Sequence, residues 1–351
     1  MIRAVQSGEY DTDHLALMMS QTGGGCRASN YIALLRYALK QMGLSHIPVI
    51  SFNLVGMEKN PGFSISASLI IKAVKALLFG DLITELLYRV RPYEVVPGSA
   101  DALYEKCNER MLKEVESAGF THFRKLVRSI IKEFEEFEID ETLEKPKVGV
   151  VGEILVKYHP GANNDIVGTI EREGGEAVVP GMLDFFLYGF YNKKFNYEKL
   201  AGSFKDMAFN MTALKAAEKV RDIVRGELKG SKRFHVPERI EEVAAKAENI
   251  LSMGSQCGEG WLLTGEMVEL MDRGIENIVC LQPFACLPNH VTGKGMIKPM
   301  RKYNEWSNIC AIDFDPGASE VNQLNRIKLM MATAFKNMEK KKALEAEKKT
   351  G

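Results

Sequence analysis

Residues 148–179, VGVVGEILVKYHPGANNDIVGTIEREGGEAVV, decide the fold class of this chain. The stretch opens on a continuous apolar run, Val148 to Val151, which is typical of a strand buried on both faces. A polar loop follows, and then a helical pattern around Ile166 that ends at Gly174-Gly175. A second apolar run, Ala177 to Val179, completes a strand, helix, strand unit. Such a unit predicts a parallel sheet.

The pattern continues downstream. Two long helical stretches, at about residues 197–228 and 238–252, precede two further apolar runs at residues 278–281 and 309–314. Strands that alternate with helices favour a parallel, doubly wound α/β sheet, since each crossover helix packs back onto one face.

The beginning of the chain has a shorter version of the same pattern. A strand is predicted from His14 to Met19, a helix from about Cys26 to Met42, and a second strand from Ile47 to Phe52. Two strands alone cannot bury both faces of a parallel sheet. Residues 1–60 therefore read as a partial α/β domain, whose remaining strands we expect from an upstream domain or a partner subunit.

Between the two α/β parts the apolar period becomes helical, which predicts a helical domain over residues 61–146. Residues 147–338 then form the larger α/β domain, and its last helix is predicted to begin at Ser319 as N-cap. The Lys- and Glu-rich residues 339–351 are interpreted as a frayed, charged tail.

Composition excludes several classes of function. The 46 basic and 46 acidic residues cancel, so no overall field attracts nucleic acid. The longest apolar stretch, Ile65 to Phe79, is interrupted by Lys72 and Lys75 and is too short for a membrane span. The first residues lack the apolar core of a signal peptide. We expect a cytoplasmic protein with no membrane or nucleic-acid partner.

Two of the six cysteines lie in loops that follow predicted strands. The first loop, TGGGCR, carries Cys26, and the second, QPFACLPNH, carries Cys286. Ligands of open α/β folds bind at the carboxyl ends of strands, so these thiols are candidate cofactor ligands facing one cleft. For Cys26 the alternative stays open that the glycines only make a tight turn and the thiol fills a small pocket.

A third glycine-rich break, GSQCGEGW, carries Cys257, which is either a further ligand or part of an ordinary turn. No Cys-x-x-Cys pair occurs, which argues against a zinc ribbon or a ferredoxin-type binding run. Cys280 and Cys310, within predicted strands, read as buried thiols. Neither a P-loop nor a GxGxxG spacing follows the first strand.

The loop after Val151 is a candidate substrate loop, because it follows the first strand of the larger α/β domain. Its chemistry-bearing side chains, together with a histidine beyond Cys286, are Glu153, Lys157, His159, Asn163 and His290. A polar loop with helix-capping asparagines and ordinary surface histidines is the alternative. The sequence identifies no catalytic residue.

Five segments together resemble the 2-hydroxyacyl-CoA dehydratase activase-related proteins, a group similar to the dehydratase subunits and the double-cubane cluster proteins. These segments are QTGGGCRASNY, GEILVKYHPGANN, GSQCGEGWLLTGEM, QPFACLPNHVTGKG and DFDPGASEVNQLNRIKLMM. The resemblance covers nearly the whole chain. It implies an α/β fold with two Rossmann-like parallel-sheet domains, the first incomplete here, and a helical domain between them.

The resemblance also implies an oxygen-sensitive iron-sulfur cluster, most simply of the 4Fe-4S type, held by cysteines between the domains. Cys26 and Cys286 match the family's ligands of the first and last α/β domains. A further family cysteine is missing from the equivalent stretch, Val178 to Asp184, so Cys257, an upstream segment or a partner chain would have to supply that ligand. The ATPase signature of the activase itself is absent, which assigns ATP hydrolysis to a partner reductase.

Two hypotheses of different classes follow. The first is an iron-sulfur component of a dehydratase-like, ATP-dependent, low-potential electron-transfer system, acting on acyl-CoA type substrates, with Cys26, Cys257 and Cys286 as ligands. The second is a cluster-free scaffold that completes a larger activase- or dehydratase-like assembly. Zinc binding is disfavoured because the cysteines lack close pairing.

Overall fold

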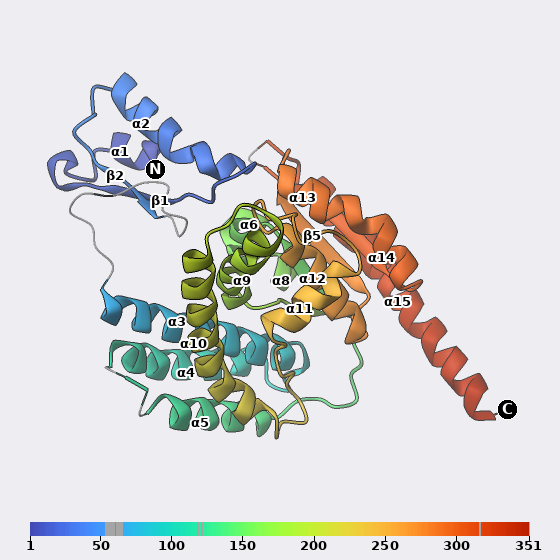
Figure 1. Cartoon of the computed structure of the whole chain (residues 1–351). Helices are drawn as coiled ribbons and strands as arrows, with labels where there is room; N and C mark the ends of the chain where they lie inside the picture. The colour runs from blue at the N-terminus through green and yellow to red at the C-terminus, as the bar shows by residue number, and fades with distance from the viewer. Residues whose placement is uncertain (53–59, 61–65, 118, 121, 316, 351) are drawn as a thin grey trace.

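A computed structural model describes residues 1–52, 60, 66–117, 119–120, 122–315 and 317–350. It contains a small N-terminal unit, a layer of helices and a larger sheet unit, and their arrangement can be followed in Figure 1. Both sheets are parallel, with two and four strands, which confirms the predicted α/β class. The predicted boundary at residue 60 lies beside residues 53–59 and 61–65, which are outside the described residues.

The N-terminal unit is built on two parallel strands, β1 (Leu17–Ser20) and β2 (Val49–Phe52). Helix α2 (Tyr31–Gln41) connects them, and α1 (Ile2–Gln6) packs against α2. The small core of this unit consists of Val5, Leu17, Ile32, Leu39, Ile47 and Val49. Side chains that alternate with this core along the strands, Met18 and Phe52, are exposed. The sheet is therefore covered on one face.

The first strand begins later than the predicted His14. The Asp11 side chain accepts a hydrogen bond from the Asp13 N–H and caps a 3-10 helix at Thr12–His14. This local bond holds the chain in a turn until Leu15, so extended pairing starts only at Leu17.

The helix predicted from Cys26 begins at Tyr31. Residues Arg27–Asn30 form a 3-10 helix first, with Cys26 at its N-cap. The glycines that precede Cys26 explain the delay, since Gly23 and Gly24 both have positive φ and hold the chain in a tight loop.

The four-stranded sheet has the order β4-β3-β5-β6. The strands are β3 (Lys147–Gly152), β4 (Glu176–Val178), β5 (Asn277–Pro283) and β6 (Asn308–Phe314). All pairings are parallel. All four strands predicted in this part of the sequence are confirmed.

Helices cover both faces of this sheet, which explains the continuous apolar runs of its strands. On one face α8 (Ile166–Arg172) and α15 (Glu320–Thr350) share a core with β3, β5 and β6. On the other face α12 (Gly260–Asp272) and α14 (Ile297–Tyr303) do the same. The expected doubly wound arrangement of the sheet is thus present.

The predicted polar loop after β3 contains two short helices, α6 (Ile154–Tyr158) and α7 (Pro160–Asn163). The Glu153 carboxylate accepts a hydrogen bond from Val156 N–H at 2.9 Å and so caps α6. Pro160 occupies the first turn of α7, where its missing N–H costs nothing.

The helical layer contains α3 (Ala67–Val90), α4 (Ser99–Glu116) and α5 (Phe123–Glu135). Helices α9 (Leu183–Lys199), α10 (Phe204–Leu228) and α11 (Ile240–Glu248) belong to the same hydrophobic core. The sequence boundaries placed all of residues 147–338 in the α/β domain. Residues 183–248 instead share the core of the helical layer, because α10 packs on α3 and α5, α9 packs on α10, and α11 packs on α9 and α12.

One predicted helix, over residues 197–228, is in fact the end of α9 and the whole of α10. The chain breaks between them at Leu200, and Gly202 packs so closely on α9 that a Cβ there would lie 2.7 Å from the Asn196 carbonyl oxygen. Only glycine fits this crossing.

Helix α15 begins after Ser319, whose Oγ accepts a hydrogen bond from Asn322 N–H, as the predicted N-cap requires. The tail predicted as frayed over residues 339–351 is helical to Thr350. Lys341 anchors this part of the helix through an ion pair with Glu276 and a cation–π contact with Trp306. Beyond it α15 extends away from the body (Figure 1).

Among the described residues, no helix combines the length and the apolar character that crossing a membrane requires.

Candidate functional site

The strand order of the four-stranded sheet has a switch point at its carboxyl edge, which we call the crevice. From β3 the chain crosses to β4 on one side, and from β4 it returns to β5 on the other side of β3. Ligands of open α/β sheets bind at such a switch point. Glu153 directly follows β3, and its N–H donates to the Leu281 carbonyl of β5 at 2.9 Å. Cys286 follows β5 and is the N-cap of α13 (Leu287–Thr292).

The three candidate cysteines come from three elements that meet at this crevice. Cys26 ends the glycine loop of the N-terminal unit, Cys257 lies in the loop before α12, and Cys286 precedes α13. Figure 1 shows the N-terminal unit meeting the rest of the molecule beside α13. Cys257 is exposed, whereas Cys26 and Cys286 are half-buried.

Direct contacts join the glycine loop to the other two segments. The Gly25 N–H donates to the Cys257 Sγ at 3.3 Å, across 232 residues of sequence. A Cβ at Gly24 would lie 3.1 Å from the same sulfur, and one at Gly25 would lie 3.9 Å from the Leu287 side chain. At Gly24 the positive φ and this tight approach both favour glycine, whereas the distances at Gly25 are ordinary contacts. Tertiary structure brings the three predicted ligand segments together.

The Cys286 thiol has a side-chain donor. Asn289 Nδ2 lies 3.3 Å from the Cys286 Sγ and 2.8 Å from the Glu259 carboxylate. Burial raises the pKa of Cys286, and the hydrogen bonds from Asn289 oppose that rise, since they stabilise a thiolate. Nearby Glu259 and Cys26 act in the same direction as burial. Asn289 thus connects a candidate ligand to a buried carboxyl group.

One buried carboxyl group, Glu259, and one half-buried carboxyl group, Glu153, lie near this site. Burial raises the pKa of Glu259 to about 7, and the neighbouring Glu153 raises it further. Burial likewise raises the pKa of Glu153. The Glu259 carboxylate accepts hydrogen bonds from Ile154 N–H and Asn289 Nδ2. A carboxyl group with a pKa near 7 can hold or release a proton at neutral pH.

Several buried polar atoms of these segments have no hydrogen-bond partner among the residues that the structure describes. They are Thr22 Oγ1 in the glycine loop, Gln282 Oε1 and Asn289 Oδ1 in the QPFACLPN segment, and Tyr188 OH, which packs against Gly260. Buried polar atoms are nearly always hydrogen-bonded, so this group favours a ligand or bound water in the crevice.

The three thiols are not in a coordinating arrangement. The described part of the chain has no group of three Cys, His, Asp or Glu side chains placed to hold a metal ion. The donor set itself suits a cluster, because it consists of thiols with N–H donors at two of the sulfurs. Loading a cluster would require the sulfurs to converge through side-chain rotation or a shift of the glycine loop.

The other candidate residues have different environments. Lys157 is buried and pairs with Glu266 of α12, so it serves the interior rather than a substrate loop. Asn163 is buried at the end of α7 and accepts a hydrogen bond from the Ile166 N–H at the start of α8, whose N-cap is Asp165. His159 is exposed at the start of α7.

His290 lies in α13, with Nδ1 2.9 Å from the Cys286 carbonyl oxygen. Of the five candidate loop residues, His290 thus contacts the candidate ligand Cys286, and Glu153 lies near the buried Glu259. Cys280 is fully buried in β5, as expected, and burial raises its pKa to about 12. Cys310 of β6 is half-buried, and Cys107 is buried in α4.

Sequence reasoning missed three residues of the site, Glu259, Asn289 and Tyr188. Glu259 stands two residues after Cys257 and Asn289 three after Cys286, and this spacing is the signal that was present. Tyr188 is far from any cysteine in sequence and reaches the site only through α9.

Compared with protein-family models, curated proteins and solved structures, the chain matches none. Inference of its function therefore rests on the residues of the site itself.

Proposed function

We propose that this protein is the iron-sulfur component of a low-potential electron-transfer system similar to the 2-hydroxyacyl-CoA dehydratases, with Cys26, Cys257 and Cys286 as cluster ligands. One observation carries the proposal: the Gly25 N–H lies 3.3 Å from the Cys257 Sγ, so the loop of one predicted ligand is seated on the next. The two segments are 232 residues apart in sequence, so only the tertiary structure brings them together. Their meeting at a sheet switch point is what a shared cofactor requires.

The chain's own residues would perform distinct tasks. A bound cluster would supply one-electron transfer. Asn289 would hold the Cys286 sulfur through its N–H donor, and the Gly25 amide would do the same for Cys257. Such N–H donors tune a cluster's potential. Glu259 would keep or release a proton at its carboxyl oxygens close to the crevice. The resemblance adds an acyl-CoA type substrate and an ATP-hydrolysing reductase as partner.

The test is iron and acid-labile sulfide per chain after anaerobic purification and reconstitution. We expect about four irons with matching sulfide. Cys26→Ser, Cys257→Ser and Cys286→Ser should each lower the iron content, whereas Cys310→Ser in β6 is the matched control and should retain it. An iron-free protein after reconstitution, or full iron in all three variants, contradicts the proposal.

A second candidate, a scaffold without a cluster, is favoured by the N-terminal sheet. Its two strands leave Met18 and Phe52 exposed at 44% and 37% of their surfaces, an unusual state for a parallel sheet. Light scattering of the iron-free chain distinguishes this role. A stable oligomer or a complex with a partner supports the scaffold, and a self-sufficient iron-free monomer opposes it.

A further inference from the structure

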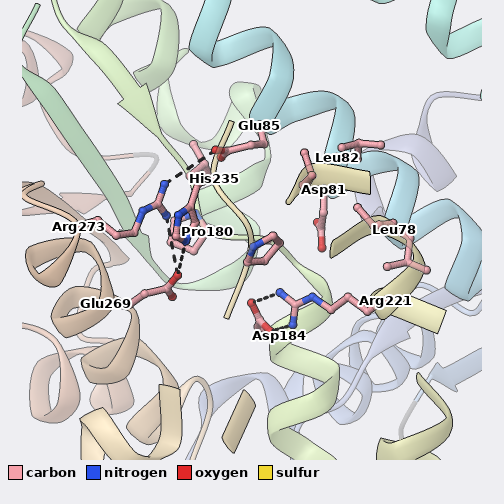
Figure 2. A pocket seen from close by; sticks show the side chains of 15 residues that line it. Leu78, Asp81, Leu82, Glu85, Pro180, Asp184, Arg221, His235, Glu269 and Arg273 are labelled. Atoms are coloured by element: carbon pink, nitrogen blue, oxygen red, sulfur yellow. Dashed lines mark hydrogen bonds and ion pairs between the residues drawn. The ribbon is translucent and has the colours of Figure 1, made fainter. Parts of the chain in front are cut away.

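A second site lies between the helical layer and the sheet, away from the cysteines. Two small cavities, about 60 and 50 Å³, adjoin each other where α3, α12 and the loop after α10 meet beside the edge strand β4. Glu85, His235 and Arg273 line both cavities. Figure 2 shows Arg273 and His235 pointing toward the same region, with Glu269 below them and Glu85 above.

Arg273 is the unusual residue of this site. Its side chain is only 19% exposed, and its ion-pair partners Glu85 and Glu269 lie 3.9 and 3.8 Å away. Both separations exceed a hydrogen bond. Within the described residues this guanidinium makes no hydrogen bond, so its N–H groups can donate to water or to a ligand.

His235 shares this property. Its Nε2 atom is buried without a hydrogen-bond partner and lies 3.8 Å from Glu269 Oε1, the same oxygen that Arg273 approaches. His235 and Arg273 therefore both lie beside Glu269 without a hydrogen bond to it, and their N–H groups can donate to a ligand in the adjoining cavities.

The charge balance favours an anion in the second cavity. Its lining includes four cations, Arg89, Lys147, Arg233 and Arg273, but only two carboxylates, Glu85 and Glu176. Glu176 is already engaged by Arg89 at 3.3 Å and by the Tyr93 hydroxyl at 2.7 Å. Glu269, 3.8 Å from Arg273, is a third carboxylate beside this group, so one positive charge remains uncompensated at a half-buried place, where charge compensation matters.

We propose that this junction binds one small tetrahedral oxyanion of the phosphate class, with Arg273 and His235 as direct donors and Arg89 and Lys147 as supporting charges. The planar fork of an arginine matches phosphate oxygens. The small volume admits a single phosphoryl group rather than a nucleotide. A bound anion would tie α3, α12 and the β4 edge together. The proposal is independent of the cysteine site.

The test measures binding of inorganic phosphate by calorimetry and by the melting temperature, against chloride at equal ionic strength. We expect phosphate to stabilise the native chain more than chloride does. Arg273→Met keeps the apolar stem and should weaken binding roughly tenfold to hundredfold, since it removes charge-assisted hydrogen bonds. Arg301→Met, an exposed arginine on α14, is the matched control and should bind normally.

A second variant keeps the test decisive if Arg273→Met does not fold. Lys147 is 45% exposed at the start of β3, so Lys147→Met should fold and still weaken phosphate binding several-fold. Equal effects of phosphate and chloride, or unchanged affinity in both variants, would overturn the proposal. Methyl phosphate distinguishes the source: binding as tight as phosphate indicates the phosphoryl group of a larger ligand, and selective binding of phosphate indicates the free ion.

Discussion

Glu259 is a side chain whose protonation the fold controls. It is 6% exposed, beside Glu153, and burial raises its pKa to about 7. At pH values between 4.5, the ordinary pKa of glutamate, and about 7, Glu259 holds a proton in the folded protein that it releases in the unfolded chain. The stability contributed by this group is therefore present at low pH and is lost as pH rises through that window.

Replacing this carboxyl group should flatten the pH dependence of stability. In Glu259→Gln the side-chain oxygen still accepts from Asn289, but no proton is taken up. We expect the free energy of unfolding of the native chain, relative to this variant, to fall by up to about 1.4 kcal/mol per pH unit between pH 5 and 7. Urea unfolding at both pH values measures it. Glu248→Gln, at an exposed position of α11, is the control. A constant difference between native chain and Glu259→Gln contradicts the assignment.

At the level of elements, a buried ion pair connects α6 to α12. Lys157 Nζ lies 2.8 Å from Glu266 Oε1, with side chains 1% and 6% exposed. Such pairs cost much desolvation, so losing one partner harms stability more than losing both.

We therefore predict that Lys157→Met destabilises the fold by about 3–5 kcal/mol. The double variant Lys157→Met/Glu266→Leu should recover most of this loss, because no unpaired charge remains in the interior. Urea denaturation of the native chain, both single variants and the double variant gives the coupling energy. Additive effects would show that the two side chains do not depend on each other.

The strands were predictable because each central one is a run of apolar residues between polar ends. Val148 to Val151 and Ile278 to Leu281 read this way, since helices cover both faces of their sheet. Helix α9 was missed in most of its length. Its aromatic-rich sequence, LDFFLYGFYNKKF, has no clear apolar stripe, because different sides of the helix contact α10, α11 and α12.

The candidate site was predictable only in outline. The rule that strand ends converge selected the loops of Cys26 and Cys286, and glycine spacing added Cys257. Lys157 and Glu259 show why the other site residues could not be predicted. Burial decides their roles, and burial depends on elements far away in sequence. Local pattern alone cannot distinguish an interior lysine from one in a substrate loop.

At the level of the whole molecule, contact between the N-terminal unit and the larger unit depends on a glycine. Gly24 has φ +63°, and its Cβ position lies 3.1 Å from Cys257 Sγ. Gly43 has a similar φ of +72° but no atom within 4 Å. A Cβ at either position would therefore meet a similar backbone penalty, but only at Gly24 would it also meet another atom, the Cys257 sulfur.

Comparing alanine at both positions isolates the contact. Gly24→Ala and Gly43→Ala should each cost about 1 kcal/mol for left-handed backbone. Only Gly24→Ala should also push the loop from Cys257, which frees the Gly25 amide. Hydrogen exchange of residues 20–27 reports this as faster deuterium uptake in Gly24→Ala than in Gly43→Ala. Identical uptake in the two variants would mean that the loop is held by something other than the sulfur.

The 232-residue separation between Gly25 and Cys257 also bears on biosynthesis. At translation rates of about 5–20 residues per second, the glycine loop leaves the ribosome roughly 10–50 s before its partner sulfur. During that interval the Cys26 thiol lacks the neighbours that the Cys257 and Cys286 segments supply. The crevice therefore comes into existence late, after most of the chain has been made, and a nascent chain halted before residue 257 has a thiol but no site.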